Sequence, residues 1–222
     1  MEPIPFAGSE LCGYRHVCAF FNSPQEEYAT LLPFVRDGLE RGERAYHVLP
    51  AHYRQEHLDQ LLSAGIDVRA AQQRRQLEVA TPEEVYLRNG RFNKEAMLEV
   101  TQEVLKAGPR LGFPLTRVIA LGFPLTRLIV ETVLQDWSVA NEWIEYETLL
   151  NEVLPHYHDP VICCYDANLL NGAIAVDLLR THPVVIIGGR LYENPFFVPP
   201  TKFLTEIAAR SGKAPKPYRS AT

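Results

Sequence analysis

The pattern of hydrophobic and polar positions is clearest between residues 15 and 50, where two apolar runs flank a stretch with helical spacing. Residues 16–21 form a short apolar run without alternation, which is typical of a strand covered on both faces. Residues 24–41 then carry apolar side chains at helical spacing, and residues 45–49 form a second apolar run. Two buried strands joined by one helix predict a right-handed, parallel βαβ unit.

Capping residues define the ends of the helix in this unit. Ser23 suits the N-cap, Pro24 suits the first helical position, and Glu26 completes an S-x-x-E capping box. Gly42 lies where a left-handed residue ends a helix. Pro33 lies inside the helical stretch, so we expect a kink there.

Strands and helices alternate through the rest of the chain. We expect strands over residues 77–79, 161–165 and 184–187, helices over 51–64, 93–107, 141–154, 172–180 and 201–211, and an extended segment over 191–200. This order predicts an α/β fold, a three-layer sandwich around a mostly parallel sheet. We expect one domain over residues 15–211, preceded by a flexible lead-in (1–14) and followed by a disordered tail (212–222).

A tandem repeat interrupts this order. Residues 111–117 and residues 121–127 both read LGFPLTR. Two parallel strands cannot follow each other so closely, because their crossover needs a dozen or more residues. We therefore expect one copy to lead into a sheet strand and favour 127–132, with the other copy in a loop or hairpin.

Composition excludes several classes of protein. The 222 residues carry a formal net charge of −5, so no basic surface for nucleic acid is expected. No apolar run is long enough to span a membrane, and the N-terminus lacks the features of a signal peptide. The four cysteines show no C-x-x-C spacing. We expect a cytoplasmic protein with reduced thiols and neither nucleic acid nor membrane as a partner.

The turn after the first strand does not suit a nucleotide. Phosphate loops need glycines, whose N–H groups converge on the anion, and usually a lysine. Residues 20–24 contain neither, and Pro24 lacks an N–H. Glycine-rich dinucleotide, G-x-S-x-G and H-E-x-x-H motifs are also absent from the sequence, so we expect no cofactor.

Three stretches resemble the MEDS domain, a sensory domain named for methanogens, methylotrophs and a dichloromethane-responsive regulator. They read HVCAFFNSPQEEYATLLPFVRDGLERGERAYHV (16–48), WIEYETLLNEVLPHYHDPVICCYD (143–166) and LLRTHPVVIIGGRLYENPFFVPPTKFL (178–204). The last is the most specific, with T-H-P, then G-G, then E-N-P-F-F-V-P-P. The resemblance implies a sensory role.

The first stretch is also similar to RecA-like ATPases of the circadian-clock type. It keeps G-L-E-R-G-E at residues 38–43 but lacks the phosphate loop. This implies a RecA-like sandwich without a nucleotide site. MEDS domains are generally fused to DNA-binding or kinase modules, for which this chain has no room. We therefore expect a protein partner, a regulator or a kinase, and a homo-oligomer is possible.

A ligand site is expected beyond the carboxyl ends of the strands, where open α/β sheets bind ligands. Aromatic walls and polar anchors there suit a small, largely apolar or cationic molecule. The expected ligand-binding residues are Phe21, Asn22, His52, Glu131, Trp137, Tyr165 and Asp166, with Asn194 closing the site from the extended segment. The alternative is that Asp166 and Asn194 only cap turns while Trp137 fills the core.

Other reactive side chains have structural alternatives. Cys18, Cys163 and Cys164 lie on two strands that could be neighbours, but buried cysteines usually pack as small hydrophobic residues. His156 and His158 form a possible metal fragment, although zinc needs three or four converging ligands. We favour core packing, a polar loop and no metal site. His182 is expected to end a helix near its last carbonyl groups.

Three classes of function remain open. A non-catalytic sensor predicts a mostly apolar cavity with few polar anchors. An interaction scaffold predicts no cavity and a large apolar surface. An enzyme, using Glu131, Asp166 and Cys163, predicts titratable groups with shifted pKa values in a cleft. The sensor is the preferred interpretation.

Overall fold

The computed structural model describes residues 2–86, 92–122, 126, 127, 129 and 137–210. Its central feature is a seven-stranded sheet in the order β5-β4-β6-β7-β3-β8-β9, in which β9 runs antiparallel to β8 and the other pairs are parallel. The predicted α/β fold with a mostly parallel sheet is confirmed. The strands are β3 (His16–Phe21), β4 (Arg44–Val48), β5 (Leu77–Ala80), β6 (Thr116–Ala120), β7 (Val161–Asp166), β8 (Val184–Ile187) and β9 (Arg190–Glu193).

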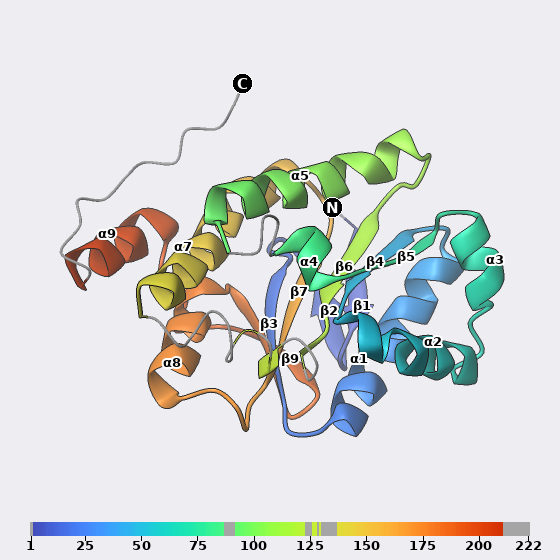
Figure 1. Cartoon of the computed structure of the whole chain (residues 1–222), viewed down its shortest axis with the longest axis horizontal. Helices are drawn as coiled ribbons and strands as arrows, with labels where there is room; N and C mark the ends of the chain where they lie inside the picture. Colours follow the sequence, from blue (N-terminus) through green and yellow to red (C-terminus); the bar gives the residue numbers. More distant parts are fainter. Residues whose placement is uncertain (1, 87–91, 123–125, 128, 130–136, 211–222) are drawn as a thin grey trace.

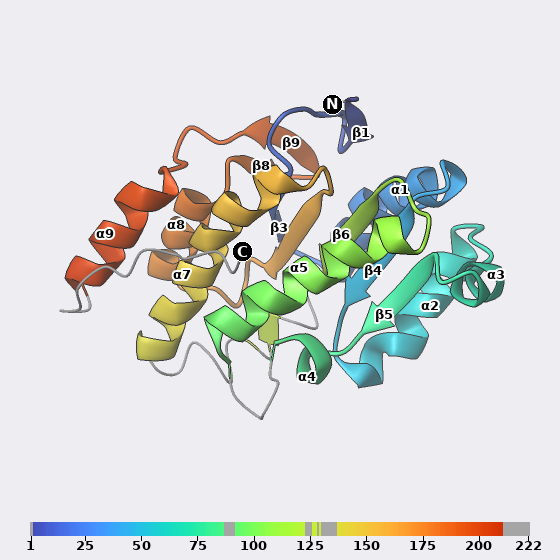
Figure 2. The ribbon, with the colours of Figure 1, turned by 90° about the horizontal axis from the view of Figure 1, so that it is seen from above.

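Helices cover both faces of this sheet (Figures 1 and 2). One face packs against α1 (Pro24–Glu40), α2 (Arg54–Ser63) and α3 (Val68–Gln73). The other face packs against α5 (Lys94–Arg110), α7 (Trp137–Val153), α8 (Gly172–Thr181) and α9 (Pro200–Arg210). Short helices α4 (Pro82–Val85), η1 (Ala51–Tyr53) and η3 (Leu154–His156) complete the described elements.

The first residues form a β-hairpin, which differs from the flexible lead-in predicted over residues 1–14. Strands β1 (Ile4–Phe6) and β2 (Ser9–Leu11) pair antiparallel. Phe6 stacks on Phe34 of α1 with ring centroids 4.1 Å apart, and Leu11 is also buried. The hairpin therefore extends the core on the α1 face. The predicted disordered tail, 212–222, lies outside the described residues.

The turn between β3 and α1 is closed by its own side chains. The Ser23 hydroxyl accepts a hydrogen bond from the Glu26 N–H, which confirms the predicted N-cap. The Glu26 carboxylate accepts from the Asn22 N–H (2.8 Å) instead of the Ser23 N–H that a capping box would use. A carboxylate thus occupies the helix N-terminus, where a bound phosphate would lie. Helix α1 continues through Pro33.

The G-L-E-R-G-E stretch (38–43) packs against a buried arginine from another strand, Arg117. Arg117 of β6 is 1% exposed and donates to Glu43 (2.5 Å) and Asp37 (2.8 Å). A Cβ atom at Gly38 would lie 2.5 Å from the Arg117 side chain, so only glycine leaves room for it. Gly42, as predicted, has the left-handed φ of +76° that ends α1.

The structure corrects the prediction for the repeat. Among the described residues the sheet strand at this point is β6, Thr116–Ala120, which begins with the last two residues of the first copy. It lies between β4 and β7, and from this position Arg117 reaches its carboxylate partners. In the second copy Thr126 and Arg127 are helical. Residues 128 and 130–132 lie outside the described residues.

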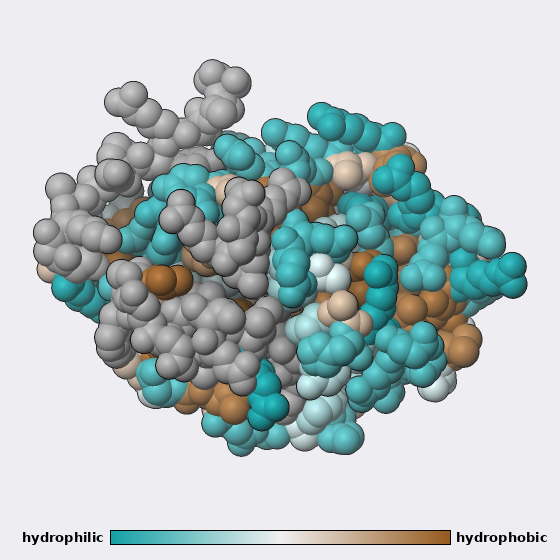
Figure 3. Space-filling view, in the orientation of Figure 1, coloured by the Kyte–Doolittle hydropathy of each residue, from teal (hydrophilic) through white to brown (hydrophobic). Residues whose placement is uncertain are grey.

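Polar residues dominate the face of the molecule drawn in Figure 3, where hydrophobic patches appear mainly on the side of α2 and α3. Leu62 of α2 is 62% exposed. Among the described helices, none is both long and apolar enough to cross a membrane.

Mg-ATP is expected not to bind. The β3–α1 turn offers a carboxylate in place of converging N–H groups and a lysine. Isothermal titration calorimetry is the measurement. A dissociation constant below about 100 μM, roughly 5.5 kcal/mol of binding, would contradict this prediction.

One copy of LGFPLTR is expected to be dispensable. Deleting residues 111–120 lets the second copy supply the Thr-Arg start of β6, and the matched deletion of residues 121–130 keeps the original strand. Both variants should stay soluble and folded, as measured by circular dichroism and thermal unfolding. A drop in Tm of more than about 10 °C, or about 3 kcal/mol for a chain of this size, would show that the missing copy is structural.

Candidate functional site

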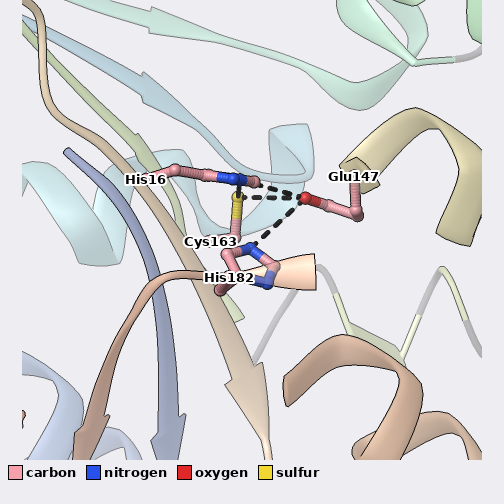
Figure 4. Close-up of side chains that lie close together, drawn as sticks. All are labelled: His16, Glu147, Cys163 and His182. Carbon is pink, nitrogen blue, oxygen red and sulfur yellow. Dashed lines mark hydrogen bonds and ion pairs between the residues drawn. The ribbon is translucent and has the colours of Figure 1, made fainter. Parts of the chain in front are cut away.

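A buried carboxylate lies at the centre of the α7 face. Glu147, 1% exposed, projects from α7 toward the sheet (Figure 4). Its Oε1 accepts a hydrogen bond of 2.9 Å from the Tyr165 hydroxyl. Its Oε2 faces Nε2 of His16 at 3.3 Å, Nε2 of His182 at 3.4 Å and Sγ of Cys163 at 3.6 Å. We call His16, Glu147, Cys163 and His182 the polar cluster.

Hydrogen bonds fix the tautomer of both histidines. Nδ1 of His182 lies 2.8 Å from the Leu178 carbonyl oxygen, which only accepts, so Nδ1 carries the proton. Nδ1 of His16 lies 3.1 Å from Asn151 Oδ1. The Asn151 Nδ2 group donates to backbone carbonyls, including that of Thr181, so its Oδ1 faces His16 as an acceptor. When the rings are neutral, both Nε2 lone pairs therefore point into the polar cluster.

Burial and the neighbouring groups together shift the pKa values of His16, Glu147 and Cys163. Burial lowers the pKa of His16 to about 4, helped by the neighbouring His182 and opposed by Glu147. Burial alone would raise the pKa of Glu147, but the neighbouring His16 and His182 outweigh burial and lower the pKa to about 2. Burial also raises the pKa of the Cys163 thiol well above its ordinary value. At neutral pH we therefore expect an ionised Glu147, an uncharged His16 and a protonated thiol.

Strand alternation brings the polar cluster together. His16 and Cys163 lie on β3 and β7, which pair in parallel with Cys18 beside Cys163. Because side chains alternate between the faces of a strand, His16, Cys18 and Cys163 share the face that α7 covers. His182 follows α8 directly, and its contact with the Leu178 carbonyl confirms the prediction that it lies at the helix end.

A small aromatic cavity adjoins the polar cluster. It lies between the sheet and helices α5 and α7 and has a volume of about 40 Å³. Glu147 and Cys163 form part of its wall, so the cavity and the cluster are continuous. The aromatic lining comes from Tyr46, Tyr86, Trp143, Tyr146 and Tyr165, and the aliphatic lining includes Val48, Met97, Val100 and Ala120.

Few polar groups other than Glu147 face this aromatic cavity. The Thr101 hydroxyl donates to the Met97 carbonyl and lies 3.1 Å from the Tyr146 hydroxyl. The indole N–H of Trp143 is buried and has no hydrogen-bond partner among the described residues. A buried donor without a partner costs roughly 1–3 kcal/mol. A ligand with a hydrogen-bond acceptor would remove that cost.

The residues predicted for the site do not meet in one place. Tyr165 lines the aromatic cavity. Phe21 packs on the opposite face of the sheet, against the α1 side. Asn22 and His52 are exposed, on the β3–α1 turn and on η1. Glu131 and the side chain of Trp137 lie outside the described residues.

A second cavity opens at the carboxyl ends of the strands, where the ligand was expected. It measures about 240 Å³ and is lined largely by charged and tyrosine side chains, namely Glu27, Tyr28, Tyr53, Glu56, Arg127 and Asp166, with Pro24 and Leu169. We call it the edge cavity. Asp166 also accepts hydrogen bonds from Asn168, so it caps a turn as well.

Asn194 has a structural position away from both cavities. Its Nδ2 donates to the carbonyls of Leu179 and His182, and its Oδ1 accepts from the Phe196 N–H. The segment expected to extend across the opening forms edge strand β9 and then leads to α9. Residues 191–200 line neither cavity.

The cysteines and the histidine pair singled out in the sequence do not form functional clusters of their own among the described residues. Cys18 and Cys163 share one face of the sheet, and Cys164 packs on the other, so the three thiols do not form one cluster. His156 and His158 are exposed. Within the described residues they belong to no group that could hold a metal ion, whereas the polar cluster does form such a group.

Comparison with known families adds to this geometry. A family model described as "MEDS: MEthanogen/methylotroph, DcmR Sensory domain" matches residues 15–183. The chain belongs to the MEDS family. The resemblance found in the sequence is thereby confirmed. None of the curated proteins compared with the chain matches it.

Membership implies a sensory or signalling role for this MEDS domain, which is consistent with a non-catalytic function. All four residues of the polar cluster lie inside the matched region. From the sequence, Cys163 was considered with other cysteines and His182 as a helix end, and His16 and Glu147 were missed. The available signal was Glu147 itself, a charged residue on the apolar stripe of its helix, three residues from both Ile144 and Leu150.

Thiol reactivity should follow burial in the MEDS domain. Cys12 is exposed, whereas Cys18, Cys163 and Cys164 are buried with raised pKa values. Titration with Ellman's reagent should modify one thiol per native chain and four after denaturation. The Cys12→Ser variant should show no fast reaction. Rapid modification of a second thiol in that variant would contradict the protonated, inaccessible Cys163 described above.

Proposed function

We propose that this MEDS domain senses a small, uncharged organic molecule that carries a hydrogen-bond acceptor and binds in the aromatic cavity. The observation that carries this proposal is that Trp143 lines the cavity while its buried N–H has no partner among the described residues. Thr101 and Tyr146 supply hydroxyl groups on the same lining. An aromatic cavity with few polar anchors is typical of small-molecule sites.

Size and charge restrict the ligand. One water needs roughly 10–15 Å³ of such volume, so a cavity of about 40 Å³ accepts a molecule of only a few heavy atoms unless the lining moves. An anion would meet the ionised Glu147, and the described residues of the lining include no lysine or arginine. A cation would compete with the hydrogen bond that Tyr165 already donates to Glu147. An uncharged molecule avoids both costs.

Signalling would pass through contacts with a protein partner, a regulator or a kinase. Helix α7 contributes Trp143, Tyr146 and Glu147, and it also packs against α5, α8 and α9. A ligand would shift the position of α7 only by its differential affinity for two arrangements of the helices. Reduced thiols fit a cytoplasmic location.

The catalytic alternative is weaker. It relied on Cys163, Asp166 and Glu131 acting together, yet Cys163 lies in the α7 core and Asp166 lines the edge cavity. The raised pKa of the Cys163 thiol also opposes a nucleophilic role. A sensor needs neither a joint site of these three residues nor a reactive thiol.

A panel of alcohols, amines and carboxylic acids with one to four carbons tests the proposal. Uncharged members should raise the Tm of the native domain, whereas carboxylates should not. The Ala120→Leu variant fills the aromatic cavity and should lose the shift, measured against its own baseline because overpacking costs about 1–3 kcal/mol. The Trp143→Phe variant removes the N–H and should weaken binding by about fivefold, or about 1 kcal/mol.

Matched controls locate the ligand. Thr101→Val should weaken binding, whereas Thr148→Val should not, because Thr148 also donates to a helix carbonyl but does not line the cavity. Asp166→Asn, in the edge cavity, should respond like the native domain. Loss of the response in Asp166→Asn with retention in Ala120→Leu would place the ligand in the edge cavity. No response to any compound would contradict the proposal.

A further inference from the structure

We propose that the polar cluster is a metal site in which His16 Nε2, His182 Nε2, Glu147 Oε2 and Cys163 Sγ bind one zinc-type divalent ion. The four atoms lie within 4.8 Å of one another and belong to fully buried residues (Figure 4). The proposal is independent of the ligand proposed for the aromatic cavity. No metal site is expected from the sequence. The sequence does not reveal this cluster, because His16 and His182 lie far apart in the chain.

The distances fit tetrahedral coordination. Zinc binds nitrogen and oxygen at about 2.0–2.1 Å and thiolate sulfur at about 2.3 Å, which puts neighbouring ligands about 3.3–3.6 Å apart in a tetrahedron. Glu147 Oε2 lies 3.3 Å from His16 Nε2 and 3.4 Å from His182 Nε2. Cys163 Sγ lies 3.6 Å from both His16 Nε2 and Glu147 Oε2. These separations leave room for one ion at the centre.

The hydrogen bonds around the cluster leave the lone pairs for an ion. Nε2 of His182 is buried and has no hydrogen-bond partner among the described residues. It faces Glu147 Oε2 at 3.4 Å, and a nitrogen lone pair and a carboxylate oxygen attract each other only when a proton or a metal cation lies between them. His16 Nε2 faces the same oxygen at 3.3 Å, while its Nδ1 lies 3.1 Å from Asn151 Oδ1. A metal ion bound by both nitrogens and the carboxylate would supply that cation.

The outer contacts are those expected around metal ligands. Metal-bound histidines usually donate their second N–H to a carbonyl or carboxylate, and bound carboxylates are themselves hydrogen-bonded. Here the Leu178 carbonyl accepts from His182, Asn151 accepts from His16, and the Tyr165 hydroxyl donates to Glu147. Four protein ligands make a closed, structural type of site. Binding displaces the Cys163 thiol proton, which leaves to solvent.

Such an ion would join separate parts of the fold. Its ligands come from β3, α7, β7 and the residue that follows α8. The thiolate favours zinc, cobalt or a similar borderline-soft ion over magnesium or calcium, which prefer oxygen ligands. Cys163 and Glu147 also line the aromatic cavity, so the ion would lie next to its wall.

Expression of the full chain in medium supplied with Co²⁺ tests the site. The ion is then present while the chain folds and does not have to enter the buried site of the folded protein. The native chain should contain one cobalt ion by mass spectrometry of the metals and show a thiolate-to-cobalt charge-transfer band. The Cys163→Ala variant should lose the band and bind Co²⁺ at least about tenfold more weakly. Cys164→Ala is the matched control, because Cys164 is the next residue of β7, equally buried, and faces away from the cluster.

A second variant keeps the test decisive if Cys163→Ala does not fold. Asn151→Leu leaves all four ligands in place and should lower the metal affinity by about 10–100-fold. A native chain that folds without metal, cobalt bound without the thiolate band, or equal cobalt content in Cys163→Ala and Cys164→Ala would each overturn the proposal. Loss of the band in Cys163→Ala and its retention in Cys164→Ala would support it.

Discussion

The structure depends on one buried carboxylate. Taking the charge of Glu147 out of water costs several kcal/mol unless partners compensate for it. Those partners come from β3, β7 and the residue after α8, so the position of α7 is defined relative to all three. Removing one partner would leave the buried charge poorly compensated and strongly destabilise the fold.

Helix α7 connects this electrostatic constraint to the aromatic cavity. Trp143, Tyr146 and Glu147 lie three or four residues apart, so one side of the helix carries both the cavity lining and the carboxylate. A molecule that satisfies the Trp143 N–H therefore acts on the same helix that the polar cluster holds in place. If the aromatic cavity binds the proposed ligand, sensing and structural anchoring meet in this one helix.

At the carboxyl edge of the sheet, carboxylate side chains of the domain accept hydrogen bonds from the backbone N–H groups that could otherwise bind an anion. In α/β proteins this edge usually receives a ligand, often an anion at a helix N-terminus. Here Glu26 binds the Asn22 N–H, and Glu27 accepts from the Gly122 N–H. The side chains of the domain itself occupy the positions that a phosphate would need. The sheet is kept while its usual anion site is closed.

Local patterns in the sequence determined much of the fold. The apolar runs at residues 16–21, 45–49 and 161–165 predicted buried parallel strands, and Ser23 and Gly42 fixed the ends of α1, because these signals act over a few neighbouring residues. The family resemblance could also be read from the sequence. The candidate site could be predicted only in part. Tyr165, one of the residues predicted for the site, lines a cavity between the sheet and helices α5 and α7, whereas Phe21 packs on the opposite face of the sheet.

Tertiary structure alone decided the partners of Glu147 and the fate of the repeat. His16 and Cys163 are 147 residues apart in sequence, and only strand pairing shows that they meet. The two LGFPLTR copies have identical local propensities but different structures. Gly112 of the first has a φ of +87°, whereas Gly122 of the second packs so close to β7 that a Cβ atom would lie 2.7 Å from the Tyr165 nitrogen. From the first copy Arg117 reaches Glu43 and Asp37, and these long-range contacts are invisible to a seven-residue pattern.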